Sequence, residues 1–245
     1  MLTGQPSLES CAQTGLQLPD ALLLLAIDTC GATGSVALGQ QVDGELRILG
    51  EAQFDGRHGS DSLVSSVSEL LSMAEVPLPK LSAIVAVNGP GSFTGVRVGL
   101  AAVKGLAESA RIPVVALSRL EVLAHKAGIP SAALDAHRQE IYLRIGEPEA
   151  QARELLAGAQ ELAAIQPAPP RIAVCDDDAA AQLAAVWPST ELMRTLAPTA
   201  ADALKFGMAR VDAGVFVDLA LLDGHYLRRS DAEIFGEPDA GPRRA

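Results

Sequence analysis

The sequence predicts an α/β protein in which three strands come first and helices then alternate with strands. Residues 21–27 are a continuous apolar run, which is typical of a buried strand and far shorter than the ~20 residues that span a bilayer. Two alternating segments flank Asp43 and Gly44, a strong β-hairpin signal. From residue 60 the apolar residues change to helical spacing.

The expected elements of the first half follow in a regular order. Strands are expected at 21–28, 35–39, 45–54, 81–88 and 113–117. Helices are expected at 60–75, 93–110 and 118–127, the last capped by Ser118. Antiparallel strands that precede parallel ones are the unit of the actin-like and sugar-kinase-like (ASKHA) fold. We therefore expect two lobes of the βββαβαβα type, the second of them degenerate.

The second half is expected to repeat this unit less completely. Strands are predicted at 131–135, 140–145 and 172–175, and helices at 154–164, from 176–178 toward Trp187, and at 199–213. The three aspartates at 176–178 are explained more simply by a helix N-terminus than by a metal site. The predicted division is a disordered leader at 1–20, an N-terminal lobe at 21–129, a C-terminal lobe at 130–235 and a disordered tail at 236–245.

A glycine-rich turn stands between the strand at 81–88 and the helix at 93–110. Asn88 to Gly91 force a sharp change of direction, because glycine takes positive φ at little cost and proline fixes the corner. Ser92 or Thr94 can cap the helix that follows. Its free N–H groups and positive dipole end could hold a phosphate or carboxylate, or the turn could serve packing alone; both readings stay open.

The helix at 93–110 is apolar on nearly every side. One stripe, expected to cover the sheet, consists of Phe93, Val96, Leu100, Val103 and Ala107. Small residues occupy most of the remaining surface, with Gly91, Gly95 and Gly99 repeating every four residues, so a second helix could approach closely. Such a helix needs cover on two sides, either from its own chain or from another polypeptide.

Charge and cysteine content limit the classes of function. Among 245 residues, 30 acidic side chains outnumber 19 basic ones, which gives a net charge of −11. Because nucleic-acid binding depends on basic side chains that neutralise phosphates, another subunit would have to hold any RNA. Three scattered cysteines without a CxxC pair, and a polar leader without signal-peptide character, indicate a cytoplasmic protein without a disulfide framework or zinc site.

Five stretches give the chain a resemblance to the TsaB (YeaZ) family, which has a Gcp-like domain. They are AIDTC at 26–30, HGSDSLVSSVSELL at 58–71, GPGSFTGVRVGLAAVKGLA at 89–107, LDAHRQEIY at 134–142 and YLR at 226–228. The resemblance covers the first half well and the second half thinly. It implies a role in tRNA threonylcarbamoyladenosine (A37) modification beside TsaD and the ATPase TsaE. In that role the chain would be a non-catalytic, activating scaffold.

The resemblance also implies a docking surface on the first two helices, for TsaD and, when TsaD is absent, for a second copy of the chain. The candidate interface residues are Ser62, Ser65, Ser66, Glu69, Met73, Arg97, Val98, Ala101, Ala102 and Gly105. Gly99→Arg or Ala102→Glu should then abolish association and leave the monomer folded. We expect contact with tRNA only through the complex, and no membrane contact.

The sequence departs from TsaD-like enzymes where those carry an HxxxH metal pair, because Arg119 and Leu123 stand in its place. No metal and no cofactor are expected for the chain alone, and ATP or ADP only at a subunit boundary. Candidate vestigial phosphate-binding residues are Asp28, Thr29, Gly89, Gly91 and Ser92. The alternative is an ATPase or small-molecule kinase that uses Asp28 and the turn at 89–95. A metallopeptidase is a more remote third reading.

Overall fold

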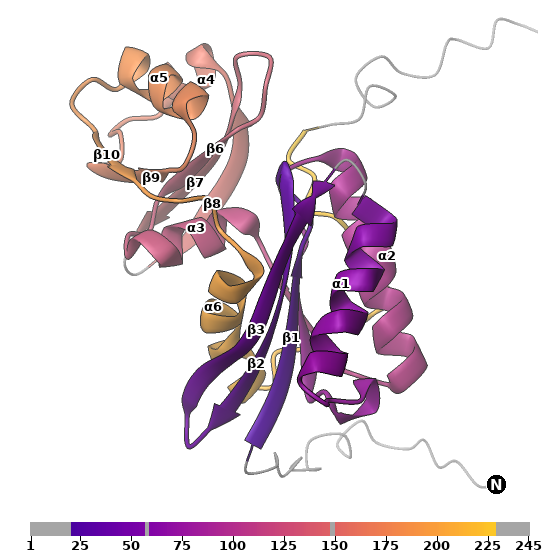
Figure 1. Ribbon diagram of the computed structural model, residues 1–245. Helices are drawn as coiled ribbons and strands as arrows, with labels where there is room; N and C mark the ends of the chain where they lie inside the picture. Colours follow the sequence, from indigo (N-terminus) through magenta and orange to yellow (C-terminus); the bar gives the residue numbers. More distant parts are fainter. Residues whose placement is uncertain (1–20, 57–58, 148–149, 229–245) are drawn as a thin grey trace, which may run out of the picture.

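The computed structural model describes residues 21–56, 59–147 and 150–228, which form two five-stranded sheets with helices on their faces (Figure 1). The first sheet has the order β3-β2-β1-β4-β5. Its strands are β1 (Ala21–Asp28), β2 (Thr33–Val42), β3 (Glu45–Asp55), β4 (Ala83–Val87) and β5 (Val114–Leu117). The first three strands are antiparallel and β4 and β5 run parallel to β1, as predicted. The predicted leader and tail lie outside the described residues.

The second sheet repeats the strand order of the first, as β10-β9-β6-β7-β8. Its strands are β6 (Ala132–Asp135), β7 (Ile141–Glu147), β8 (Ala150–Ala157), β9 (Arg171–Val174) and β10 (Glu191–Arg194). The antiparallel strands β6, β7 and β8 correspond to β1, β2 and β3, and the parallel strands β9 and β10 correspond to β4 and β5. Two sheets of this kind fit the predicted actin-like class.

Part of the second half was predicted wrongly. The segment 154–164, rich in alanine and leucine, was expected to be one helix, but it contains the end of β8 and the short helix α4 (Ala159–Ala164). Pairing of β8 with β7 overrides the local helix propensity. Strand β10 was not predicted, because four residues carry too little periodicity to be recognised.

The helices α1 (Gly59–Met73) and α2 (Phe93–Ala110) cover one face of the first sheet, and α6 (Ala200–Asp212) covers the other (Figure 1). A one-turn 3₁₀ helix, η2 (Leu78–Lys80), joins α1 to β4. The predicted cap at Ser92 is confirmed, since its side chain accepts a hydrogen bond from Gly95 N. Asp176 caps α5 (Asp177–Val186) in the same way, by accepting from Ala179 N at 2.7 Å.

The third helix of each half lies on the sheet of the other half. Helix α3 (Arg119–Ala127) packs on the second sheet, opposite the face that α4 and α5 cover, whereas α6 packs on the first sheet. Lys126 of α3 meets Asp202 of α6 at 2.7 Å where the two helices touch. Each side of residue 130 therefore supplies a helix to the core of the opposite half. No helix in the described ranges is long and apolar enough to cross a membrane.

Candidate functional site

An apolar groove of about 390 Å³ runs between α1 and α2. These two helices lie on the opposite face of the first sheet from α6. Val64 and Ser68 form its wall on α1, and Ala102, Gly105 and Leu106 form its wall on α2. Val64 keeps 63% of its surface exposed although it is a large aliphatic side chain. Exposed apolar surface gathered in one place is typical of a protein–protein contact.

The outward face of α2 continues the groove with residues spaced four apart. Phe93, Arg97, Ala101 and Gly105 are all exposed, and from the first to the last the helix rises about 18 Å. A Cβ added to Gly105 would meet no atom within 4 Å. A second helix could therefore approach the end of this line closely, because from Ala101 to Gly105, about one turn, only small side chains on it separate the α2 backbone from solvent.

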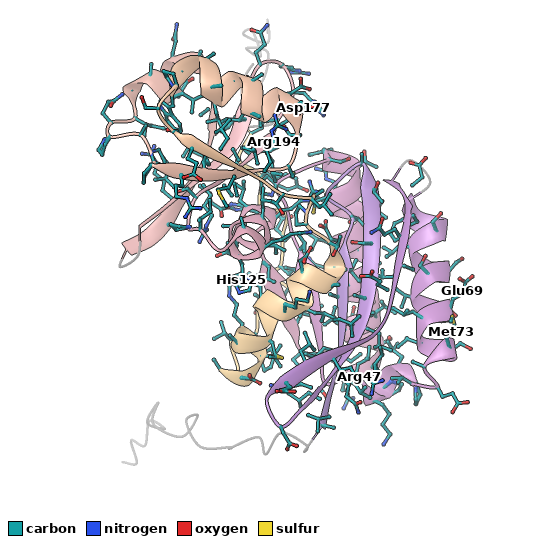
Figure 2. All side chains as sticks on the ribbon, turned by 60° about the vertical axis from the view of Figure 1, so that its left-hand side comes forward. Arg47, Glu69, Met73, His125, Asp177 and Arg194 are labelled. Carbon is teal, nitrogen blue, oxygen red and sulfur yellow. The ribbon has the colours of Figure 1, made fainter. Side chains whose placement is uncertain are left out.

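The predicted interface residues lie on or beside this surface. Ser65, Glu69, Met73, Arg97, Ala101 and Gly105 are exposed, and Ser62, Ser66, Val98 and Ala102 are partly buried. Figure 2 shows Glu69 and Met73 on the outer side of α1. Their role in an interface remains a prediction. Val64 and Ser68 also line the groove, although neither is among the predicted interface residues.

The expectation for Phe93 and for the glycine repeat was wrong. Phe93 is 51% exposed and points away from the sheet, which is covered instead by Val96, Gly99, Leu100, Val103 and Ala107. Gly91, Gly95 and Gly99 face the turn after β1: a Cβ on Gly91 would overlap the carbonyl oxygen of Cys30, and one on Gly95 that of Thr29. The repeat therefore serves packing within the chain, and Gly99→Arg would disrupt the monomer itself.

The turn after β1 and the glycine-rich turn are in direct contact, so the predicted vestigial phosphate residues do come together. Ser92 N donates to Cys30 O at 2.8 Å, and Thr29 Oγ1 donates to Gly95 O at 2.7 Å. Asp28 Oδ1 accepts from Cys30 N at 2.8 Å. The polar groups that a phosphate would need are thus bonded to one another.

A buried arginine neutralises the remaining oxygen of Asp28. Arg119 Nε lies 3.4 Å from Asp28 Oδ2, and the two side chains are only 12% and 3% exposed. The guanidinium also lies against Gly31, where it leaves no room for a Cβ. Burial alone would lower the pKa of Arg119, but the charge and hydrogen bond of Asp28, together with Cys30 and Cys175, outweigh that effect and raise it. Burial, reinforced by Asp28, raises the pKa of the Cys30 thiol, which therefore stays protonated.

A polar network connects the two sheets beside a cavity of about 320 Å³. Glu154 of β8, whose side chain is 8% exposed, stands at its centre. Its carboxylate accepts from Ser118 Oγ at 2.6 Å and from Arg144 Nη1 at 2.7 Å, and His225 Nε2 lies 2.8 Å away. Burial alone would raise the pKa of Glu154, but the hydrogen bonds from His225, Ser118 and Arg144 outweigh it and lower the pKa below its ordinary value of 4.5.

Because the folded-state pKa of Glu154 is lowered, its contribution to stability is complete above pH 4.5 and is lost as the pH falls through the folded value. Glu154→Gln should lower the free energy of unfolding at pH 7 by about 1–3 kcal/mol, since it removes charge-assisted hydrogen bonds. The loss should shrink between pH 5 and pH 3. Urea denaturation at several pH values measures both effects. Glu69→Gln, on the exposed side of α1, is the control, and an undiminished loss at pH 3 would contradict the prediction.

The segment 222–228, here called the C-terminal strap, crosses from the first sheet to the second. His225 N donates to Asn88 O at 2.7 Å at the glycine-rich turn. Arg228 Nη2 donates to Ala136 O at 2.8 Å and lies 2.7 Å from Glu140 Oε2, both in the turn after β6. Between these anchors Tyr226 packs on Phe93 of α2, with ring centroids 5.5 Å apart.

Comparison with known proteins agrees with this architecture. Residues 53–168 match the family model described as TsaD, tRNA N6-adenosine threonylcarbamoyltransferase. The TsaB protein of Bacillus subtilis is 36% identical over 125 residues, which are 49% of this chain and 53% of that protein, and the TsaB protein of Haemophilus influenzae is 38% identical over 127 residues, 49% and 52%. The solved structure of YeaZ from Pseudomonas aeruginosa superposes with a TM-score of 0.66 at 27% identity, over 84% of this chain and all of that one. The chain belongs to the TsaB/YeaZ family.

The sequence match spans about half the length of these curated TsaB relatives. It confirms the family inferred from the five stretches. Both relatives are named as tRNA threonylcarbamoyladenosine biosynthesis proteins.

Arg119 and Leu123, which stand where TsaD-like enzymes carry the HxxxH pair, make structural contacts in this TsaB-family chain. Arg119 forms the ion pair with Asp28, and Leu123 is fully buried in the core between α3 and the second sheet. Within the described part of the chain, no three His, Cys, Asp or Glu side chains gather in a metal-binding arrangement.

Proposed function

We propose that the chain is a non-catalytic scaffold and activating subunit in tRNA threonylcarbamoyladenosine (A37) biosynthesis, and that it docks on TsaD through α1 and α2. The observation that carries the proposal is the apolar groove between these helices, with Val64 on one side and the small residues Ala102 and Gly105 on the other. Burial of such surface contributes roughly 25 cal/mol per Å² before the cost of association is subtracted.

The match to the TsaD model supports this choice of partner. It covers residues 53–168 and therefore includes both α1 and α2. A TsaD protein should carry counterpart helices, so like surfaces can pack against each other, as at an isologous interface. The same geometry would let a second copy of the chain occupy the face when TsaD is absent.

The ion pair of Asp28 and Arg119 supports a binding role over the alternative of an ATPase or kinase. A carboxylate that orients a metal–phosphate complex must be free to face it, whereas Asp28 is 3% exposed and already neutralised. We therefore propose that ATP or ADP binds only at a subunit boundary of the complex, in which TsaE is also present. Calorimetry of the isolated chain with magnesium and ADP should give no heat of binding, and micromolar affinity would favour the alternative.

The charge of the chain agrees with an indirect relation to RNA. A net charge of −11 repels phosphates, so TsaD or another subunit should hold the tRNA. The complex would work in the cytoplasm, where tRNA is modified.

The test is co-purification of the full chain with the TsaD protein of the same organism, followed by a tRNA modification assay. Ala102→Glu should lower the affinity for TsaD at least about a hundredfold, because it buries an unpaired charge in the groove. Modification of tRNA should fall in parallel.

Ala184→Glu is the matched control, since Ala184 is an exposed alanine on α5, far from the groove. It should bind TsaD like the wild type. Full complex formation by a folded Ala102→Glu protein would show that the docking face lies elsewhere.

A further inference from the structure

The C-terminal strap holds an aromatic side chain in the open at the N-terminal end of α2. Tyr226 is 41% exposed and Phe93 is 51% exposed, and the two rings are tilted by 47° against each other. The Arg97 guanidinium lies 3.7 Å from the centre of the Phe93 ring, and Arg97 Nε is 3.4 Å from the Tyr226 hydroxyl. We call Phe93, Arg97 and Tyr226 the aromatic cluster.

The cluster is rigid because the strap is fixed on both sides of Tyr226. His225 N is bonded to Asn88 O, Leu227 packs against the core around α3, and Arg228 is bonded to Ala136 O and Glu140. Two large rings and a guanidinium are therefore presented without the entropy cost of ordering them upon binding. Tyrosine and arginine are among the residues that most often dominate binding energy at interfaces.

The cluster continues the docking face. Phe93 and Arg97 are the first two members of the exposed line on α2 whose last member, Gly105, borders the groove. A partner helix laid along α2 from Gly105 would reach the cluster after about 18 Å. The small residues would allow close approach at one end of this line, and the aromatic cluster would supply contact area at the other.

We propose that Tyr226 of the strap is a docking residue, so that the TsaD partner contacts this chain through the strap as well as through α1 and α2. The inference rests on the proposed function and extends its surface to a segment far along the chain. TsaD is the occupant argued for because the cluster continues the face of α1 and α2, and both of these helices lie within the residues that match the TsaD model. The strap lies beyond the residues that match the TsaD model.

Binding of TsaD to Tyr226→Ala should be weakened about tenfold or more in calorimetry. Tyr226→Phe, which keeps the ring on Phe93 and removes the hydroxyl near Arg97, should bind nearly as well as the wild type. Leu221→Ala is the control, because Leu221 is 80% exposed immediately before the strap and lies outside the cluster.

Ala102→Glu separates this inference from the proposed function. If Tyr226→Ala binds like the wild type while Ala102→Glu does not bind, the strap is outside the interface and the proposed function stands. If neither variant alters binding, the proposed function fails and the inference fails with it.

Chemical protection of the wild-type chain gives an answer that does not depend on how the variants fold. Tetranitromethane nitrates exposed tyrosines, and Tyr226 should react in the free, dilute chain and be protected in the TsaD complex. Tyr142, the other tyrosine, is the internal reference, since burial raises its pKa and lowers its reactivity. Equal nitration of Tyr226 in the free chain and in the complex, measured by peptide mass spectrometry, would overturn the inference.

Discussion

Gly95→Ala is expected to lower the free energy of unfolding by about 3 kcal/mol, a large effect for one methyl group. The new Cβ would overlap the carbonyl oxygen of Thr29, which belongs to the backbone of the turn after β1. Neither side can yield easily, because Thr29 Oγ1 is itself bonded to Gly95 O and the turn is tied to Ser92 N. Helix α2 would have to move away from the first sheet.

Gly105→Ala is the matched comparison, because it makes the same change on the same helix. An added Cβ there meets nothing within 4 Å, so the helix should become more stable by roughly 0.5–1 kcal/mol. In urea denaturation, the two variants should change the free energy of unfolding in opposite directions. A Gly95→Ala protein as stable as Gly105→Ala would show that α2 does not touch this turn.

Arg119→Met is expected to cost about 3–5 kcal/mol at neutral pH, since it leaves the Asp28 carboxylate buried without its cation. Asp28 keeps one hydrogen bond, from Cys30 N, which does not replace a full positive charge. The measurement is the free energy of unfolding in urea. The helical circular dichroism of the variant before denaturation checks that it is folded.

A double variant distinguishes the charge from the packing of the side chain. Asp28→Asn with Arg119→Met removes both charges and should recover most of the stability that either single change loses. The amide oxygen introduced by Asp28→Asn could still accept from Cys30 N. If the double variant instead loses as much stability as the two single variants together, there is no ion pair at this position.

The first half of the fold could be predicted from the sequence because its signals are local. The hairpin at Asp43 and Gly44, the helical spacing from residue 60 and the glycine-rich turn each specify an element within a few residues. The structure confirms all five strands of the first sheet. In the second half β8 and β10 owe their conformation to pairing with distant strands, which no local pattern records.

The candidate site was predictable only in part, for a similar reason. Helical spacing correctly indicated that α2 lacks polar cover, but it could not tell which small residues face the chain itself. Gly95 and Gly99 contact Thr29, some 66 to 70 positions earlier, whereas Ala101 and Gly105 remain open. The packing of Tyr226 on Phe93 joins residues 133 positions apart, so no sequence signal pointed to it.

The placement of α6 on the first sheet also has a consequence for biosynthesis. On the ribosome, β1 to β5 are complete once residue 117 has emerged, but their second apolar face stays bare until residues 200–212 follow. The nascent chain must therefore carry a half-covered sheet through more than eighty further residues of translation. Separate expression of either half would leave a sheet without its third helix, so the two halves must mature together.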